Sequence, residues 1–203
     1  MKICAVICEY NPFHFGHAYQ ISEMKKRGAV IAVMSGNFTQ RGDAAVLSKY
    51  ERAEIAVRYG ADLVLELPFP YSSASAEIFG GAGVRIAHAL GCVDELCFGS
   101  ETGEIAPLLT LSDRLQSEGF RKALSVYLEK NRSQSYRSAV GKAYREFYGE
   151  DFRRAGRTTF CRFPISLPCA SCAPISFPLR LCEKERIITE RARALPRQRR
   201  CAP

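Results

Sequence analysis

Two histidines that flank a glycine carry the clearest chemical signal in this sequence. His14 and His17 stand three positions apart, with Gly16 between them, shortly after an apolar run that ends at Cys8. Imidazole N–H groups can stabilise the charge that develops on phosphoryl oxygens during transfer. Gly16 would let a phosphate approach the backbone, and the start of a helix would add a positive dipole end. The turn therefore predicts a nucleotide site for attack at the α-phosphate of ATP.

The same spacing also permits simpler roles. One histidine could cap the helix while the other packs, or the pair could hold an adventitious metal ion. The position of the pair favours the nucleotide site, because ligands of open parallel sheets bind outside the carboxyl ends of the strands. We therefore interpret His14 and His17 as catalytic residues.

Alternating apolar runs and helical patterns surround this turn. Buried strands are predicted by the apolar runs at 3–8, 29–34, 62–67 and 93–98. Helices are predicted over 17–27, 48–60, 75–90 and 104–148, the last broken near Gly119 and Asn131, with a capping box at Ser48 and Glu51 and a C-terminal cap at Gly91. This alternation predicts an α/β fold with a doubly wound parallel sheet, followed by C-terminal helices.

Several polar side chains follow the second predicted strand. Ser35, Asn37 and Arg41 lie on a loop that would face the same crevice, so we consider them as substrate-binding residues. Arg41 could pair bidentately with a carboxylate or phosphate, or it could be a solvated loop arginine. Lys49 and Arg52, near a helix start, could meet RNA phosphate or belong to a solvated helix face.

The remaining candidates are predicted to be structural. Asp62 begins a strand and is interpreted as a structural residue, and His88 as a surface or packing residue. Cys4 and Cys8 share a parity in the first strand, which favours the core over metal ligation. The pair Cys169-Ala-Ser-Cys172 has no matching partner pair, so no metal site is predicted.

Composition places the chain among ordinary globular proteins. It has 203 residues with 47% hydrophobic and 25% charged residues, enough for one domain with a sizeable core. No apolar run approaches the roughly 18 residues needed to cross a membrane, so we expect a cytoplasmic protein without a membrane partner. Its nine cysteines are expected to be free thiols. The oligomeric state stays open.

The basic excess is confined to the last quarter of the chain. Residues 1–152 hold 17 basic and 18 acidic residues, whereas residues 153–203 hold 12 and 3, a net charge of +9. The last quarter also holds six of the ten prolines and five of the nine cysteines. We therefore divide the chain into a domain with trailing helices at 1–152 and a basic tail at 153–203, which we expect to be disordered.

Four sequence blocks resemble one known family. They are Glu9-Tyr-Asn-Pro-Phe-His-Phe-Gly-His17, Val33-Met-Ser-Gly-Asn-Phe-Thr-Gln-Arg-Gly42, Gly60-Ala-Asp-Leu-Val-Leu-Glu-Leu-Pro68 and Cys97-Phe-Gly-Ser-Glu101. In this order they are similar to the bacterial tRNA(Met) cytidine acetate ligases, over residues 1 to about 152. The resemblance implies a Rossmann-like nucleotidyltransferase fold. It further implies that ATP and acetate form acetyl-adenylate, which acetylates N4 of the wobble cytidine of elongator tRNA(Met).

The resemblance also implies a binding site. Magnesium would bridge the pyrophosphate oxygens that leave. Two alternatives stay open: a small-molecule adenylyltransferase, or a catalytically dead ATP- or tRNA-binding remnant. The ATP-binding residues that the resemblance implies are Ile7, Cys8, Glu9, Tyr10, Asn11, Pro12, Phe13, His14, Phe15, Gly16, His17, Ala18, Tyr19, Gln20 and Gly99.

The tail departs from the family. A segment resembling Pro-Asn-Asp-Ile-Leu is expected after the helices, and the chain instead reads Gly156-Arg-Thr-Thr-Phe-Cys161. Codon degeneracy allows those six residues to encode Pro-Asn-Asp-Ile-Leu when the frame starts at the last base of the Gly156 codon. We therefore expect that the reading frame is lost near 152–155, which would leave the catalytic site incomplete. A genuine basic arm that binds tRNA phosphates is the competing interpretation.

Overall fold

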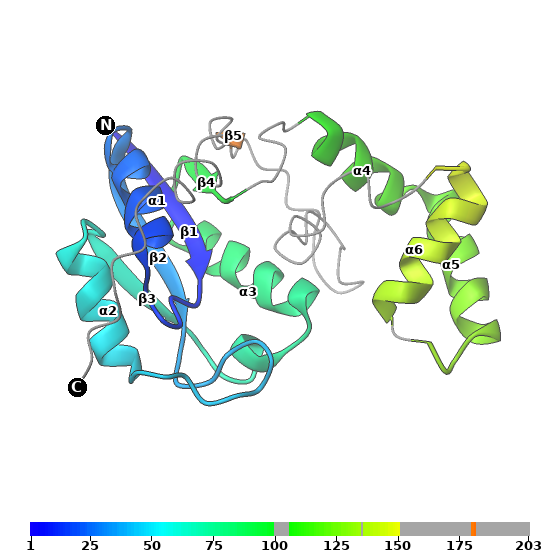
Figure 1. Cartoon of the computed structure of the whole chain (residues 1–203). Helices are drawn as coiled ribbons and strands as arrows, with labels where there is room; N and C mark the ends of the chain where they lie inside the picture. The colour runs from blue at the N-terminus through cyan, green and yellow to red at the C-terminus, as the bar shows by residue number, and fades with distance from the viewer. Residues whose placement is uncertain (100–105, 135, 151–179, 182–203) are drawn as a thin grey trace.

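A parallel β-sheet forms the centre of the computed structural model, which describes residues 1–99, 106–134, 136–150 and 180–181. Its strand order is β3-β2-β1-β4-β5 (Figure 1). All four neighbouring pairs are parallel, which confirms the predicted sheet type. The strands are β1 (Lys2–Cys8), β2 (Gly28–Ser35), β3 (Leu63–Leu67), β4 (Glu95–Cys97) and β5 (Arg180–Leu181).

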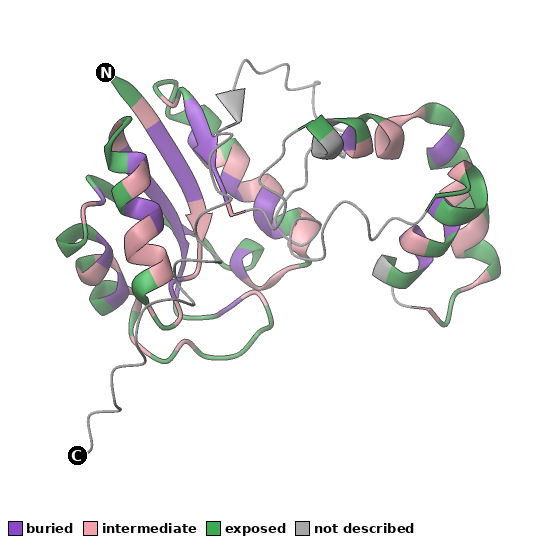
Figure 2. Cartoon of the chain, turned by 45° about the horizontal axis from the view of Figure 1, so that its top comes forward, coloured by how far each residue is buried: buried purple, intermediate pink, exposed green. Residues whose placement is uncertain are grey.

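Helices cover both faces of this sheet. Helices α1 (Phe15–Lys25) and α2 (Lys49–Arg58) pack on one face, where Ile21, Met24 and Ala56 join a buried cluster with β1 and β2. Helix α3 (Ala76–Ala89), preceded by the short 3₁₀ helix η1 (Tyr71–Ser73), packs on the other face. The middle of β1, most of β2 and all of β4 are buried between the layers (Figure 2). The doubly wound architecture is confirmed.

Parallel pairing brings the strand ends to one edge. Cys8 at the end of β1 pairs with Met34, and Ser35 at the end of β2 pairs with Leu67. The loops that follow β1, β2 and β3 therefore emerge side by side at the carboxyl edge, together with Gly99 just beyond β4. This edge is where ligands of such sheets bind.

Helix boundaries follow the predicted caps with two corrections. Ser48 and Glu51 form the predicted capping box at α2, and Gly91 ends the α3 region with a φ of +66°. Helix α1 starts at Phe15, two residues before the predicted start, because His14 is its N-cap. The break expected near Gly119 lies at Ser117, whose side chain accepts a hydrogen bond from the Phe120 N–H.

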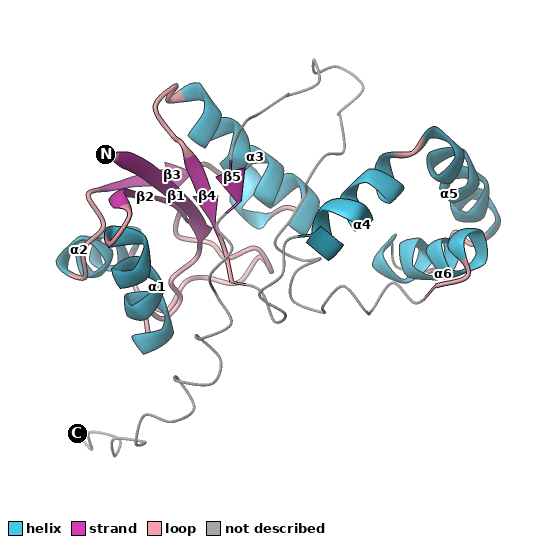
Figure 3. Ribbon diagram, turned by 90° about the horizontal axis from the view of Figure 1, so that it is seen from above, coloured by secondary structure: helices cyan, strands magenta, loops and turns pink. Residues whose placement is uncertain are grey.

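The C-terminal helices form a core of their own. Helices α4 (Ala106–Gln116), α5 (Glu118–Lys130) and α6 (Tyr136–Tyr148) enclose Phe120, Val140, Ala143 and Tyr144. Figures 1 and 3 show these three helices grouped beyond α3, away from the sheet. None of the helices in the described residues is long and apolar enough to cross a membrane. Apart from β5, the predictions for 153–203 concern residues outside those described.

Asp62 fastens the edge of the sheet to α1. Its Oδ2 accepts a hydrogen bond from the Val30 N–H at 2.7 Å, and Oδ1 pairs with Lys25. The hydrogen bond with Lys25, together with the one from Val30, lowers the pKa of the Asp62 carboxyl below its ordinary value of 3.8. The prediction that Asp62 is structural is confirmed.

Replacing Asp62 by asparagine should therefore change acid stability. A carboxyl whose pKa is lowered by folding stabilises the fold above its ordinary pKa of 3.8, and this contribution is lost as pH falls through the folded value. Since the side chain is partly exposed, we expect Asp62→Asn to lower the free energy of unfolding by roughly 0.5–1 kcal/mol at about pH 7. Urea unfolding at about pH 7 and about pH 3 should show that difference shrinking in acid. Asp113→Asn on α4 is the control, and a difference independent of pH would contradict the assignment.

Candidate functional site

The loop between β1 and α1 is a compact turn around aromatic rings. Tyr10, which is 1% exposed, adopts a φ of +49° and turns the chain at the end of the strand. Its ring lies 5.0 Å from the Phe13 ring and 4.9 Å from the His17 ring. Phe13 stacks in turn on Tyr59 at 5.0 Å. Aromatic packing around the buried Tyr10 thus anchors the loop that leads to the two histidines.

Both histidines lie at the N-terminus of α1. Their rings stack at a centroid distance of 3.6 Å. The His14 Nδ1 accepts a hydrogen bond from the Gly16 N–H at 3.1 Å, and the His17 Nδ1 accepts one from the His14 N–H at 3.4 Å. A nitrogen that accepts a hydrogen bond carries no proton, so the neutral form of each ring has its proton on Nε2. Each ring is thereby a hydrogen-bond donor at Nε2.

Both histidine rings cap helix α1, which is one of the simpler roles that their spacing permits. Together they form a reciprocal capping box around the first turn of α1. Capping uses Nδ1 of each ring, whereas a phosphate oxygen would be bound by Nε2–H. The capping contacts therefore fix the orientation and the tautomer of the pair, which is what preorganised stabilisation of a charged group requires.

The loop after β2 is fastened to this turn. Residues 37–45 form a hairpin in which Phe38 and Ala44 make an antiparallel bridge. The Gln40 N–H donates to the Glu9 carboxylate at 2.6 Å, and the Val46 N–H donates to Asn11 Oδ1 at 2.7 Å. These contacts join the β1 and β2 loops into one rigid rim of the carboxyl edge.

Arg52 corrects both sequence interpretations of that residue. It is completely buried, so it neither meets RNA phosphate nor belongs to a solvated helix face. Its guanidinium donates to the Leu47 carbonyl at 3.1 Å and to the Ser35 carbonyl at 3.2 Å, and also to the carbonyls of Glu9 and Gly36. Burial lowers the pKa of Arg52, and nearby Cys8, Glu9 and Glu66 partly oppose this. One side chain thus binds the ends of β1 and β2 to the start of α2.

The sequence held one signal for this role. Arg52 stands four residues before the buried Ala56, so the helical repeat places both on the core side of α2. Charged residues are almost never fully buried unless they are paired. An arginine on an apolar face next to a strand end was therefore a candidate for binding backbone carbonyls.

The predicted substrate-binding residues divide into two groups. Ser35 is fully buried, with its Oγ 3.5 Å from the Arg52 guanidinium. The Asn37 Oδ1 accepts a hydrogen bond from the Lys49 N–H at 3.2 Å, so it supports the start of α2. Lys49 pairs with Glu66 at 2.6 Å. Arg41 lies exposed on the hairpin, and Asn37 is exposed as well, so Ser35 is the buried member of the three substrate candidates.

The implied ATP-binding residues follow the same edge. Ile7 and Cys8 end β1, residues 9–14 form the loop, and residues 15–20 begin α1. Ile7 packs against Gly83 of α3, and Gln20 is buried. Gly99 follows β4 and is partly exposed. His88 lies exposed on α3, as predicted for a surface residue.

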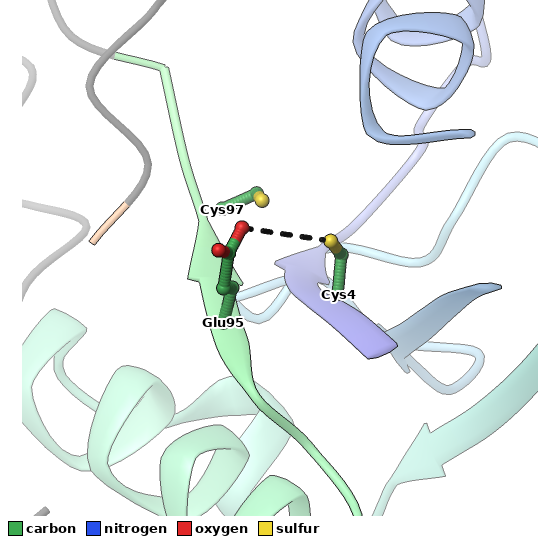
Figure 4. A group of neighbouring side chains, drawn as sticks. All are labelled: Cys4, Glu95 and Cys97. Carbon is green, nitrogen blue, oxygen red and sulfur yellow. Dashed lines mark hydrogen bonds between the residues drawn. The ribbon is translucent and has the colours of Figure 1, made fainter. Parts of the chain in front are cut away.

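A second cluster of reactive side chains lies inside the sheet domain. Cys4, Glu95 and Cys97 bring two sulfurs and a carboxylate within 4.8 Å of one another (Figure 4). The Glu95 carboxylate is buried but pairs with Lys2, and with the Arg27 Nε at 3.3 Å. Two cations therefore already balance its charge. We interpret the cluster as a buried ion pair beside two core thiols, in line with the core position predicted for Cys4.

Gly16 is required by the His14 ring. A Cβ at this position would lie 2.9 Å from His14 Cε1 and 3.1 Å from Nδ1. We expect Gly16→Ala to displace the ring, remove its cap and weaken ATP binding by about tenfold, equivalent to one lost hydrogen bond. Gly141→Ala in α6, where a Cβ meets no atom within 4 Å, is the control. Titration calorimetry with ATP measures the difference, and equal affinities of the two variants would contradict the role given to Gly16.

Comparison with known proteins identifies relatives of this chain. The family model described as HIGH Nucleotidyl Transferase matches residues 1–163. The tRNA(Met) cytidine acetate ligase of Alkaliphilus metalliredigens is 43% identical over 165 residues, which are 78% of this chain and 38% of the relative. The protein of that name from Acetivibrio thermocellus is 49% identical over 121 residues, 58% of this chain and 29% of the relative.

A solved structure shares the fold. The crystal structure of Thermotoga maritima TmcAL bound with alpha-thio ATP superposes with a TM-score of 0.69 at 38% identity. The match covers 76% of this chain and 39% of that chain. The chain therefore spans less than half the length of the relatives it matches.

Proposed function

The chain belongs to the HIGH nucleotidyltransferase family, and on that premise we propose that it takes part in ATP-dependent activation of acetate. Acetate would attack the α-phosphate of ATP to give acetyl-adenylate and pyrophosphate. The N4 amine of the wobble cytidine of elongator tRNA(Met) would then take the acetyl group, with release of AMP and a proton. ATP, acetate and this tRNA are accordingly its proposed ligands.

One observation carries the proposal. The His14 and His17 rings are stacked, capped at Nδ1 and held at the N-terminus of the first helix of a parallel sheet. Nε2–H donors on two stacked rings at a helix N-terminus suit the charge that develops on the α-phosphate oxygens. The relatives named as acetate ligases and the neighbour bound with alpha-thio ATP support the same substrates.

Magnesium fits this edge mainly through the nucleotide. Of the carboxylates near the described rim, Glu9 accepts the Gln40 N–H, Glu66 pairs with Lys49, and Asp43 is exposed on the hairpin. The ion would be held mainly by phosphate oxygens and water, as Mg²⁺ commonly is. Bound there, it would neutralise charge on the departing pyrophosphate.

Acetate-dependent exchange of pyrophosphate into ATP tests the function. We expect slow exchange that requires both the chain and acetate, because the frame lost near 152–155 leaves the catalytic site incomplete. Binding of ATP without exchange would instead identify a catalytically inactive remnant. Exchange supported by a nucleotide-like acceptor but not by acetate would identify a small-molecule adenylyltransferase. Either result would overturn the proposed reaction.

We further propose that residues 153–203 are translated out of frame. The charge break and the Pro-Asn-Asp-Ile-Leu sequence recoverable from 156–161 support this. The coding DNA is the test: codons at 156–161 that cannot encode that motif in the shifted frame would refute the proposal. A restored frame should raise any exchange activity, because the second half of the family's site would then follow.

A further inference from the structure

Two phenylalanine rings stand exposed on the loops that follow β2 and β3, at the carboxyl edge of the sheet. Phe38 is 46% exposed on the hairpin after β2, and Phe69 is 69% exposed on the loop after β3. Their ring centroids are 6.0 Å apart, with the planes tilted by 54°. Large apolar side chains gathered at a sheet edge indicate binding, and the adenylation chemistry at His14 and His17 does not account for them.

Both rings are carried by rigid backbone. The Phe38 hairpin is closed by hydrogen bonds from the Thr39 N–H to the Asp43 carbonyl and from the Ala45 N–H to the Asn37 carbonyl, both at 2.9 Å. Phe69 leads into η1, where the Ser72 N–H donates to the Pro68 carbonyl at 3.1 Å. Rings on fixed backbone lose little entropy when a ligand binds them.

The hairpin that carries Phe38 is joined to the loop before His14. Gln40, two residues after Phe38, donates its N–H to Glu9, which belongs to the loop that leads to His14. The ring on the hairpin is therefore tied to the turn that would hold the α-phosphate. A group bound on these rings could approach an acyl group attached to that phosphate.

The size and charge of the surface favour a nucleobase. A stable protein interface needs roughly 800 Å² from each partner, more than two partly exposed rings provide. A base needs only one ring face, and unpaired RNA bases bind by stacking on aromatic side chains. Arg41, exposed three residues after Phe38, supplies a cation for the neighbouring phosphate.

We propose that Phe38 and Phe69 form a stacking platform for an unpaired base of the RNA acceptor, with Arg41 facing the adjoining phosphate. The proposal rests on the function given above, and it adds the place at which the acceptor is held. The base would be that of the reacting cytidine or of its neighbour in the loop. Stacking would hold it unpaired beside the adenylate.

The test separates stacking from attraction to phosphate. A fluorescent single-stranded cytidine heptamer and the same heptamer with an abasic centre are titrated with the full chain by fluorescence anisotropy. Both oligonucleotides carry the same phosphates, so the basic segment at 153–203 contributes equally to each. We expect the intact heptamer to bind on the order of tenfold more tightly.

Variants assign this difference to the platform. Phe38→Ala and Phe69→Ala should each reduce the preference for the intact heptamer severalfold. Phe38→Trp should preserve that preference, because tryptophan keeps a stacking face. Phe147→Ala is the control, since Phe147 is similarly exposed on α6. If both alanine variants still bound the intact heptamer as much more tightly than the abasic one as the unaltered chain does, the proposal would be overturned. Equal binding of the two heptamers by the unaltered chain would overturn it as well.

Two further measurements keep the interpretations apart. Sedimentation of the chain shows whether the rings instead join two copies of it. If Phe38→Ala and Phe69→Ala abolished a dimer and left RNA binding unchanged, the surface would be a protein interface and the proposal would be overturned. Acetate-dependent exchange is measured on the unaltered chain. Base-dependent RNA binding without exchange would refute the acetate chemistry while supporting the platform.

Discussion

Replacing Arg52 by alanine is expected to destabilise the sheet domain by roughly 3–5 kcal/mol. The side chain is completely buried and donates to four backbone carbonyls, those of Glu9, Ser35, Gly36 and Leu47. Alanine would leave these acceptors buried without their donor, at about 1–3 kcal/mol for each one that water cannot reach. Because small domains are stable by only about 5–15 kcal/mol, the loss would be a large part of the total.

Urea unfolding of the full chain, followed by circular dichroism, measures this loss. Arg58→Ala is a matched control, because Arg58 lies on the same helix but is exposed and pairs with the exposed Glu54. We expect that control to change the free energy of unfolding by less than about 0.5 kcal/mol. Arg52→Lys should fall between the two, since lysine keeps the charge but lacks the planar fork. A loss below about 1 kcal/mol in Arg52→Ala would show that water or a local shift replaces the arginine.

Replacing His14 by asparagine is expected to lower acetate-dependent exchange by about 10²–10³-fold. Asparagine is among the best N-cap residues, so its Oδ1 can take over the hydrogen bond from the Gly16 N–H. The variant therefore keeps the helix cap and loses the imidazole. Since the imidazole acts on charge that develops during transfer, binding of ATP should weaken by only about tenfold or less.

The rate of exchange and the affinity for ATP are to be measured on the same preparations. His17→Ala should lower the rate by a similar factor, and His88→Ala on the outside of α3 should leave it unchanged. Equal losses of rate and ATP affinity in His14→Asn would indicate that the ring binds substrate and transition state alike. Full exchange activity in His14→Asn would leave the ring a capping role alone.

The sequence by itself determined the layers and the place of the site. Apolar runs of strand length alternate with helical patterns, and each side chain of a central strand such as β1 must be buried whichever way it points. The local signals at Ser48 and Gly91 set helix ends without help from the rest of the chain, because a cap involves only neighbouring residues. The site at His14 could be predicted for the same reason, since the residues of a strand-to-helix turn are contiguous in the sequence.

Only the tertiary structure decided how the loops hold one another. Arg52 looked like a surface residue, because its partners at Glu9, Ser35 and Gly36 lie far from it in sequence and are backbone carbonyls, which every residue has. Phe38 and Phe69 likewise belong to different loops and meet only once β2 and β3 pair. The local sequence patterns that predict a strand or a helix cap do not predict contacts between residues that are far apart in the sequence. The His14–His17 turn was therefore readable from the sequence, and the rim that holds it required the fold.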